Sequence, residues 1–379
     1  MRLLHTSDWH LGRTLHGVDL LEHQAAYLDH LVELARTERV DAVLVAGDVY
    51  DRAIPSVEAV AVLSDALARL AETTSVVLTS GNHDSSTRLG FGAALMRDRV
   101  RLRTAVAALA EPVVVGDALV YGLPYLEPDF ARVQLADADE PLPRSHEAVL
   151  AAAMRRVRAD RARRPERRAV VMAHAFVTGG LPSESERDIR VGGVDQVAAG
   201  VFAGVDYVAL GHLHGPQAVA GPGGVVVRYS GSPLAYSFGE QHQHKSTALV
   251  DLSGDEPAVT LVPAPVPRAL ADVTGTLDEL LASSAHVADW VRVTVTDSAR
   301  PADLQRRVRA HFPHALVVMH APTGAGPGAS RAVAVGAGSD PLDVAAQFVR
   351  HVTGAPPSPA EVAVLRRAYE DVTAAERSA

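Results

Sequence analysis

The chain has 379 residues, 47% of them hydrophobic and 21% charged, which is typical of a globular protein with two or three domains. It contains no cysteine, so disulfides, thiolate zinc sites and cysteine nucleophiles are excluded. The formal net charge of −9 argues against broad nonspecific binding of polyanions. No apolar run of about 18 residues could span a membrane, and residues 2–8 are too polar for a signal peptide, so we expect a cytoplasmic protein.

The first 210 residues alternate between apolar runs and helical patterns. Six runs rich in Val, Leu and Ala are predicted to be strands buried on both faces, over residues 2–6, 41–46, 75–79, 118–122, 168–173 and 206–210. Hydrophobic residues recur at helical spacing over residues 20–39 and 57–72. This alternation predicts a layered α/β core.

The pattern changes after residue 220. Sequential strands are predicted over 225–229, 247–252 and 258–262, followed by a boundary at Pro263, Pro265 and Pro267. A small α+β unit is predicted next, with strands over 289–296 and 315–320 and a helix over 302–311. Residues 321–339 predict a flexible linker, and two amphipathic helices start at Pro341 and Pro359. We therefore expect domains over 1–265 and 266–320, and a helical tail over 340–379.

Five of the predicted strands end at Asp, Asn or His. The polar residues at these ends are Asp8, His10, Asp48, Asn82, His83, Asp84, His174, His212 and His214. Each is weak evidence alone, because a single buried histidine is more often a hydrogen-bonded core residue. Ligands of open α/β sheets gather at the carboxyl ends of the strands, so these five ends are expected to converge on one place.

The residue types suit divalent cations. Asp, Asn and His offer the oxygen and nitrogen ligands that hard and borderline cations prefer. Even seven of these nine residues exceed the needs of one six-coordinate ion with an open position, but they suit two ions that share a carboxylate. Two ions about 3.5–4 Å apart can activate a water and clamp a phosphate for in-line displacement. The pattern therefore predicts a two-metal phosphoesterase.

At these positions the sequence resembles the calcineurin-like metallophosphoesterases. The stretches HTSDWHLGR, VAGDVYDRAIPS, GNHDS, ERDIRVGG, DYVALGHLH and YSGSPLAYSF further resemble the SbcD family, nuclease subunits of bacterial SbcCD complexes. The likeness covers the whole chain, with the specific motifs in the first 240 residues. It implies an α/β fold, a layered β-sandwich flanked by helices, with a small α+β capping domain and a C-terminal helical tail.

The resemblance implies roles for the residues at the strand ends. The first metal would be held by Asp8, His10, Asp48 and His214. The second would share Asp48 and add Asn82, His174 and His212. The family uses manganese, so two Mn²⁺ ions are the implied cofactors.

His83 is, by the same resemblance, a catalytic residue that stabilises or protonates the leaving 3′-oxygen rather than a ligand. Asp84 beside it can orient the ring and favour its protonated form. The alternative is that His83 only packs beneath the strand ends. Asp51 is a further residue that could bond a ligand histidine.

Contacts with DNA phosphates are expected from loop residues near the site. They are Arg13 and His16 after the first strand, and Arg187 and Arg190 after His174. The alternative is that these are exposed loop charges. The stretch HQHK at 242–245 resembles a metal site, but the pattern favours a surface turn.

The implied function is a Mn²⁺-dependent DNA phosphodiesterase, acting as a double-strand exonuclease and a single-strand or hairpin endonuclease in replication, recombination and repair. The implied partners are DNA ends and hairpins, an SMC-like ATPase of the SbcC type docked on the tail helices, and a second copy of the chain, in a nucleoid-associated heterotetramer. The tail helices could instead pack on their own domain. The alternatives are a small-molecule phosphoesterase with the same metals, and a non-catalytic binding module, against which the complete ligand set argues.

Overall fold

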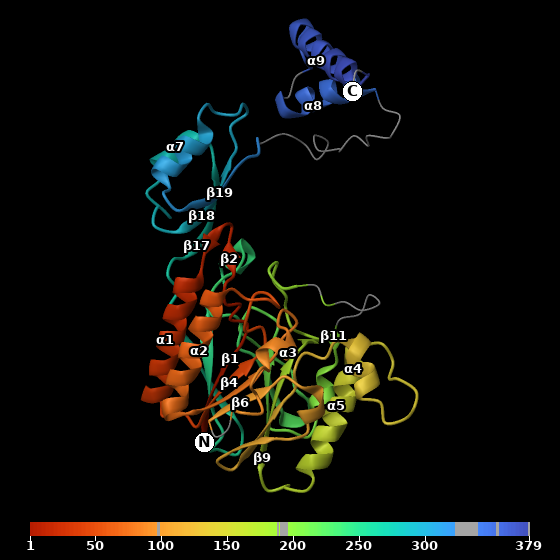
Figure 1. The fold of residues 1–379 in the computed structure, drawn as a ribbon. Coiled ribbons are helices and arrows are strands. Elements are labelled where there is room, and N and C mark those ends of the chain that lie inside the picture. Colours follow the sequence, from red (N-terminus) through yellow and green to blue (C-terminus); the bar gives the residue numbers. More distant parts are fainter. Residues whose placement is uncertain (97–98, 188, 190–195, 323–339, 354–355, 378–379) are drawn as a thin grey trace.

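The computed structural model describes the chain except for residues 97–98, 188, 190–195, 323–339, 354–355 and 378–379. The larger part of the molecule consists of two six-stranded sheets stacked face to face, with helices over both outer faces (Figure 1). A smaller α+β unit and two C-terminal helices follow. The expected α/β fold, a layered β-sandwich flanked by helices, is confirmed.

The first sheet has four parallel strands and an antiparallel edge. Its order is β16 (Ala258–Pro263), β15 (Ser246–Asp251), β1 (Arg2–Thr6), β4 (Ala42–Ala46), β5 (Ser75–Thr79) and β6 (Val100–Arg103). Helices α1 (Leu21–Thr37) and α2 (Val57–Thr73) cover its outer face and bury Leu28, Leu31 and Leu63 there. Ser56 caps α2 by accepting a hydrogen bond from the Ala59 amide, so the helix begins one residue later.

The second sheet also has a parallel centre, and its two edges are antiparallel. Its order is β13 (Gln217–Val219), β14 (Val226–Tyr229), β12 (Tyr207–Gly211), β9 (Arg168–His174), β8 (Ala118–Gly122) and β7 (Val113–Val115). Helices α4 (Pro128–Gln134) and α5 (His146–Arg161) cover its outer face. Met154 and Val157 of α5 are fully buried against Val171 of β9.

The core between the sheets is apolar. Leu44 and Val77 of the first sheet share a cluster with Val120 and Met172 of the second, and none of the four is exposed. Strands covered on both faces need apolar side chains at every position, which explains the unbroken runs in the sequence. This shared core holds the two sets of strand ends at the same edge of the sandwich.

The strands predicted as a sequential run after residue 220 belong to two different sheets. β14 pairs in parallel with β12, whereas β15 pairs antiparallel with β1 at the edge of the other sheet. Pairing between strands more than 200 residues apart leaves no local signal in the sequence. The first sheet is therefore completed by β15 and β16, and β16 ends at Pro263.

Short elements join the long strands. They are β2 (Thr14–Leu15), β3 (Val18–Asp19), α3 (Ser86–Leu89), β10 (Phe176–Val177), β11 (Gln196–Val197) and four 3₁₀ turns at Val106–Ala108, Ala199–Phe202, Pro222–Gly224 and Phe238–Glu240. The β2–β3 hairpin lies at the end of the sandwich that faces the smaller unit (Figure 1).

The smaller unit has a parallel three-stranded sheet in the order β17 (Leu270–Gly275), β18 (Trp290–Val295) and β19 (Ala315–His320), with helices α6 (Leu277–Ala282) and α7 (Leu304–His311). It has its own apolar cluster around Val293 and Phe312. Trp290 and Leu270 pack on Phe238 of the larger part. β18, α7 and β19 match the predicted elements, whereas β17 and α6 were not predicted.

The tail consists of α8 (Pro341–Thr353) and α9 (Pro359–Arg377), which contact each other. Most of the predicted linker, residues 323–339, lies outside the described residues. None of the helices in the described part of the chain combines the length and the apolar character needed to cross a membrane.

Candidate metal centre

The strand ends meet at one edge of the sandwich. Asp8 and His10 follow β1, Asp48 follows β4, Asn82 follows β5, His174 ends β9, and His212 and His214 follow β12. All of these except Asn82, which is partly exposed, are buried. The structure thus brings seven polar side chains from both sheets into one place, as the positions of the predicted strand ends imply.

Several of these residues have an unusual backbone. Asp8, His10, Asp48 and His212 have φ values of 53°, 46°, 48° and 106°, in a range that favours glycine. A non-glycine residue there costs about 1–3 kcal/mol, which the surrounding fold must offset. Strained positions of this kind concentrate at functional sites, and here four of them share one site.

Glycines allow the two sheets to approach closely at these ends. A Cβ atom on Gly211 would overlap the Ala46 carbonyl oxygen of the opposite sheet. A Cβ on Gly47 would lie 2.5 Å from His174 Nδ1, and its φ of +83° is also unfavourable for other residues. These glycines therefore determine how closely the polar side chains of the two sheets can meet.

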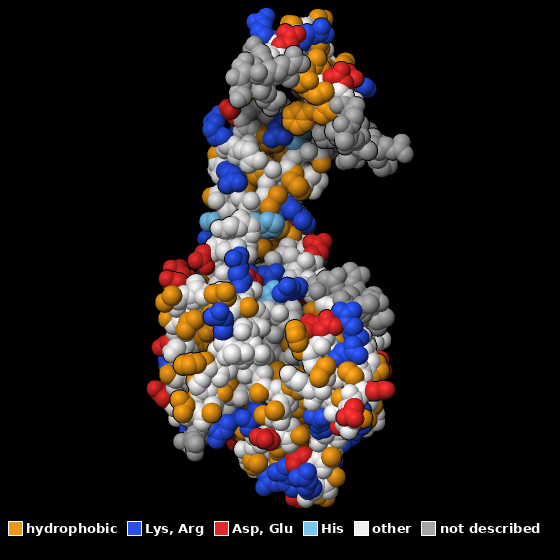
Figure 2. All heavy atoms as spheres, turned by 45° about the vertical axis from the view of Figure 1, so that its right-hand side comes forward, with side chains coloured by type: hydrophobic (Ala, Val, Ile, Leu, Met, Phe, Trp, Pro, Cys, Tyr) orange, Lys and Arg blue, Asp and Glu red, His pale blue; other side chains and the backbone are white. Residues whose placement is uncertain are grey.

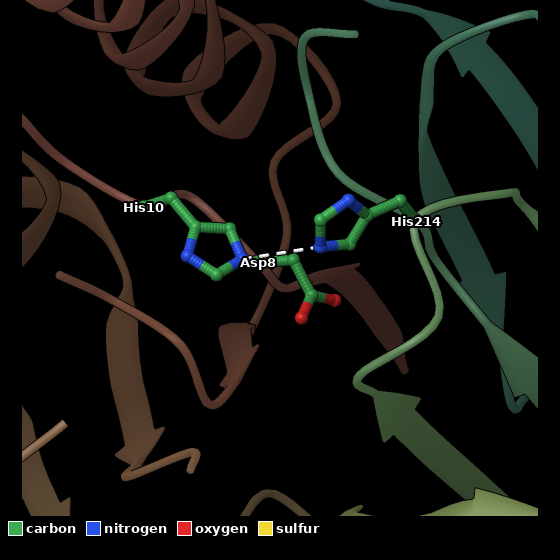
Figure 3. Close-up of side chains that lie close together, drawn as sticks. All are labelled: Asp8, His10 and His214. Atoms are coloured by element: carbon green, nitrogen blue, oxygen red, sulfur yellow. Dashed lines mark hydrogen bonds between the residues drawn. The ribbon is translucent and has the colours of Figure 1, made fainter. Parts of the chain in front are cut away.

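The first cluster contains Asp8, His10 and His214, whose ligand atoms lie within 4.8 Å of one another (Figure 3). The Nε2 atoms of His10 and His214 are 3.1 Å apart. Asp48 Oδ2 lies 3.6 Å from His10 Nε2. Both rings and two carboxylates thus present donor atoms to one small volume.

The second cluster contains Asp48, Asn82, His174 and His212. His174 Nε2 lies 3.4 Å from Asp48 Oδ2 and 2.9 Å from Asn82 Oδ1. His212 Nδ1 lies 3.3 Å from the same Asn82 oxygen. Asp48 Oδ2 therefore belongs to both clusters, which places this carboxylate where a bridging ligand would be needed.

The titration of these groups depends on burial and on mutual contacts. Burial raises the pKa of Asp8 to about 6, and it lowers the pKa of His10 and His212 well below the usual value. Burial opposes the charge on His174 too, but the nearby Asp48 raises its pKa to about 9. Neutral imidazoles and ionised carboxylates are the forms that bind cations, so a cation bound here would have to displace the proton that Asp48 favours on His174.

The residues fit divalent cations on structural grounds. Two imidazole nitrogens 3.1 Å apart compete for one proton, whereas a cation between them would use both lone pairs. Among the described residues, His10 Nδ1 and Asn82 Nδ2 are buried without a hydrogen-bond partner. His174 Nδ1 donates to the Ala46 carbonyl at 3.0 Å, which turns Nε2 toward Asp48 and Asn82 as the ligand atom.

His83 lies beside the first cluster. Its ring packs edge-on against His10, with centroids 4.7 Å apart, and its Nδ1 donates to the Asp51 carbonyl at 2.8 Å. Its backbone amide donates to Asp48 Oδ1 at 2.9 Å. The ring is thus held by the Asp51 backbone, and its other nitrogen is available for a proton transfer.

Asp84 has a different environment from the one expected. Its carboxylate accepts hydrogen bonds from the amides of Val49, Tyr50 and Gly81 at 2.9–3.1 Å. Burial and the nearby Asp48 raise its pKa to about 7. Asp84 therefore connects the loops after β4 and β5, and the orientation of the His83 ring that was expected from Asp84 comes from Asp51.

The site opens into a cavity of about 470 Å³ lined by Arg13, Thr14, Asp51, Arg52, Ala53, Asn82, His83, Asp84 and Arg187. Arg13 Nη2 donates to the Ser185 carbonyl at 2.9 Å, and its guanidinium stacks on the Tyr236 ring. Figure 2 shows basic, acidic and histidine side chains together at the narrowing between the two parts of the molecule. Arg52 was not predicted, although it directly follows Asp51.

Of the other two predicted DNA contacts, His16 does not line this cavity. His16 packs against the Phe238 ring, with centroids 5.3 Å apart. Arg190 lies outside the described residues. Asp51 lies 3.8 Å from His10 Nδ1, close enough for an electrostatic contact but too far for a hydrogen bond.

A buried group behind His214 was missed by sequence reasoning. Ser185, Glu240 and Lys245 lie next to this ring, and Lys245 is only 4% exposed although the HQHK stretch predicted a surface turn. One feature of the sequence could have drawn attention to this position, because Lys245 is the only lysine in the chain. A chain that otherwise uses arginine throughout has a lysine at this one place.

Comparisons with known proteins agree with this geometry. Residues 1–216 match the calcineurin-like phosphoesterase family, and the chain belongs to that family. Residues 266–353 match a second family, SbcD_C, described as the type 5 capsule protein repressor C-terminal domain.

Two solved structures are similar to the chain. One is TT1561 of Thermus thermophilus, with 16% identity and a TM-score of 0.39 over 69% of this chain and 98% of that one. The other is a dimetal phosphatase from Danio rerio, with 12% identity and a TM-score of 0.43 over 69% of this chain and 96% of that one.

Proposed function

We propose that this protein is a two-metal DNA phosphodiesterase of the SbcD type. The observation that carries the proposal is the pair of ligand clusters that share Asp48 Oδ2, 3.6 Å from His10 Nε2 and 3.4 Å from His174 Nε2. Membership of the phosphoesterase family supports hydrolysis of a phosphate ester. The match of residues 266–353 to the SbcD_C family supports DNA as the substrate.

The proposed ligand sets follow the two clusters. The first ion would bind Asp8, His10, Asp48 and His214, and the second would bind Asp48, Asn82, His174 and His212. Two divalent cations, for which we propose Mn²⁺, would supply Lewis-acid activation of water and neutralise charge on the phosphate. Oxygen and nitrogen donors suit Mn²⁺, although affinity alone does not select it.

The remaining chemistry belongs to His83. Its Nδ1 donates to the Asp51 carbonyl, so its Nε2 is the atom that exchanges a proton. The ring lines the open cavity beside Asn82 and is partly exposed to it. We propose that His83 donates this proton to the departing 3′-oxygen, and that Asp84 contributes by holding the loops in place.

Arginines beside the cavity are proposed to hold the DNA backbone. Arg13 and Arg187 line the cavity, and Arg52 adds a third positive charge at its rim. Phosphate contacts position a duplex without reading its sequence. The smaller unit, proposed as a domain over residues 266–320, packs on Phe238 of the larger part and would contact the duplex backbone.

We propose two protein partners. The tail would dock on an SMC-like ATPase of the SbcC type, since Phe348 and Val364 are 67% and 66% exposed on its two helices. A second copy of the chain would cover the groove between α2 and the segment after α3, where Phe91 and Leu95 are 85% and 84% exposed. Such a complex would work in the cytoplasm, at the nucleoid.

The deciding experiment offers the purified chain, with Mn²⁺, a linear duplex, a DNA hairpin and a nucleotide ester, with and without the ATPase. Cleavage of DNA that is lost in Asp48→Asn is the expected result. Efficient turnover of the ester without DNA cleavage, even with the ATPase present, would favour the small-molecule phosphoesterase instead. Glu33→Gln, at an exposed ion pair on α1, is a matched control for removal of a carboxylate charge.

A further inference from the structure

His214 differs from the other ligand histidines in how its second ring nitrogen is bound. His174 Nδ1 donates to a backbone carbonyl, but His214 Nδ1 lies 2.6 Å from the Ser185 hydroxyl. That hydroxyl in turn donates to Glu240 Oε1. A chain of side chains therefore leads from the first ligand cluster into the interior of the protein.

The end of this chain is a fully buried ion pair. Lys245 Nζ lies 2.5 Å from Glu240 Oε2, and the two residues are 4% and 1% exposed. Its other acceptors are the His214 carbonyl at 2.9 Å, Ser232 Oγ at 2.9 Å and Gln243 Oε1 at 2.7 Å. Lys245 thus reaches His214 both directly, at its backbone, and through Glu240 and Ser185, at its ring.

A buried ion pair is weak evidence for stability, because the loss of hydration offsets most of the attraction. The presence of this ion pair beside His214 therefore indicates a role other than stability. The hydrogen-bond directions supply one. A carboxylate only accepts, so Ser185 gives its proton to Glu240 and can only accept from His214. His214 must then carry its proton on Nδ1, which leaves the lone pair on Nε2.

We infer that Lys245 and Glu240 are positioning residues which, through Ser185, hold His214 in the tautomer and orientation that bind the first metal ion. The inference rests on the two-metal site proposed above and deepens it by assigning residues outside the ligand set. Partners that fix a ligand histidine are typically worth about 10–100-fold in metal affinity. Only the ion bound by His214 should depend on them.

The test measures Mn²⁺ binding directly, by titration of the full chain with detection of free Mn²⁺ by electron paramagnetic resonance. Ser185→Ala removes the nearest acceptor for His214 Nδ1, and Glu240→Gln alters the carboxylate whose Oε1 lies 3.5 Å from the same nitrogen. We expect two Mn²⁺ in the native chain and a loss of about 10–100-fold in affinity for one of them in Ser185→Ala. Ser185→Thr keeps a hydroxyl and should restore binding. Glu240→Gln should behave like Ser185→Ala.

Ser246→Ala is the matched control. Ser246 is buried next to Lys245, but its hydroxyl has no hydrogen-bond partner among the described residues, so Mn²⁺ binding should be unchanged. ¹⁵N shifts of the histidine rings add a second readout, because the Nδ1-protonated form of His214 should be lost in Ser185→Ala. If circular dichroism shows that Glu240→Gln does not fold, Ser185→Ala, which changes a loop residue, still tests the inference.

The outcomes separate this inference from the function on which it rests. Two Mn²⁺ bound with native affinity by Ser185→Ala and Glu240→Gln would overturn the positioning role and leave the metal site intact. No Mn²⁺ bound by the native chain would overturn the two-metal site itself. Equal weakening of both ions would also contradict the inference, because His214 belongs to one cluster only.

Discussion

His10 and His214 face each other with their Nε2 atoms 3.1 Å apart, although 204 positions separate them in the sequence. His10 follows a strand of the first sheet and His214 a strand of the second. The pair exists only when the two sheets are packed together. A cation bound here would therefore join the two halves of the sandwich.

Metal removal should lower the stability of the fold. A ligand that binds only the folded state stabilises it, by about 2.7 kcal/mol when its concentration is 100 times Kd. We expect the melting temperature to rise with Mn²⁺ and to return to its starting value with a chelator. Asp48→Asn should abolish this rise, and an equal rise in that variant would show that Mn²⁺ binds elsewhere.

His83→Ala should separate metal binding from turnover. His83 contacts His10 only edge-on, so both Mn²⁺ should still bind. Loss of a general acid typically reduces the rate by about 10²–10⁴-fold, and kcat on linear duplex DNA checks this. His286→Ala, at an exposed residue of the smaller unit, is the control. Native kcat in His83→Ala would remove this residue from the mechanism.

Gly211→Ala should separate the two ligand clusters. The added Cβ would overlap the Ala46 carbonyl oxygen of the opposite sheet, so the strand ends must move apart. We expect loss of Mn²⁺ binding together with a lower melting temperature. A Cβ on Gly200 meets nothing within 4 Å, so Gly200→Ala should leave both quantities unchanged. Equal behaviour of the two variants would contradict the close approach.

His5 should make the stability of the fold depend on pH. Burial lowers its pKa to about 3, and its ring accepts from the Tyr207 hydroxyl while donating to the Leu210 carbonyl. Between about pH 3 and pH 6.5 the unfolded chain binds this proton and the folded chain does not. The free energy of unfolding therefore rises with pH across this window, and it falls as the pH is lowered from 6.5 to 3, by up to about 1.4 kcal/mol per unit from this one group.

The contribution of His5 can be isolated with His5→Gln. The free energy of unfolding is measured in urea, with a chelator present, at several pH values between 4.5 and 6. Its slope against pH should be smaller in this variant by the equivalent of about one proton, which is about 1.4 kcal/mol per pH unit. Other buried groups titrate equally in both chains, so the difference belongs to His5. Parallel slopes would show that His5 is protonated in the folded state.

Deletion of residues 340–379 should abolish binding of the ATPase partner. The two tail helices expose Phe348 and Val364, and the ligand clusters lie in the larger part of the molecule. Mn²⁺ binding should therefore be unchanged while co-purification with the ATPase is lost. A truncated chain that still binds the ATPase would contradict the docking proposal.

The strand ends of the site could be predicted because the parallel strands are covered on both faces. Their apolar runs are unbroken, so Asp48 and His174 mark the points where the apolar side chains end. Because ligands gather at the carboxyl ends of strands in α/β sheets, the polar residues after these strands could be expected to lie in one place. The pairing of β15 with β1 could not be predicted, because it joins Leu3 to Val250 across most of the chain.

The contacts of charged side chains were harder to predict than their positions. Asp84 is adjacent to His83 in sequence, yet its carboxylate faces the amides of Val49, Tyr50 and Gly81. Lys245 follows three polar residues, which favour a turn, yet Glu240 neutralises it inside the protein. For Asp84, two of the three partners come from the loop after β4, which only the folded chain brings near, whereas Glu240 lies five residues before Lys245 on the same stretch of chain.

The burial of Lys245 has a practical consequence. A protease specific for lysine can cut this chain at one peptide bond, between Lys245 and Ser246, at the start of β15. In the folded chain that bond is buried, so the protease can cut only molecules in which this edge of the sheet has opened. The amount of the two fragments therefore measures how often this local opening occurs. The protein thus carries its own single-site reporter of local unfolding, which needs neither a label nor an engineered residue.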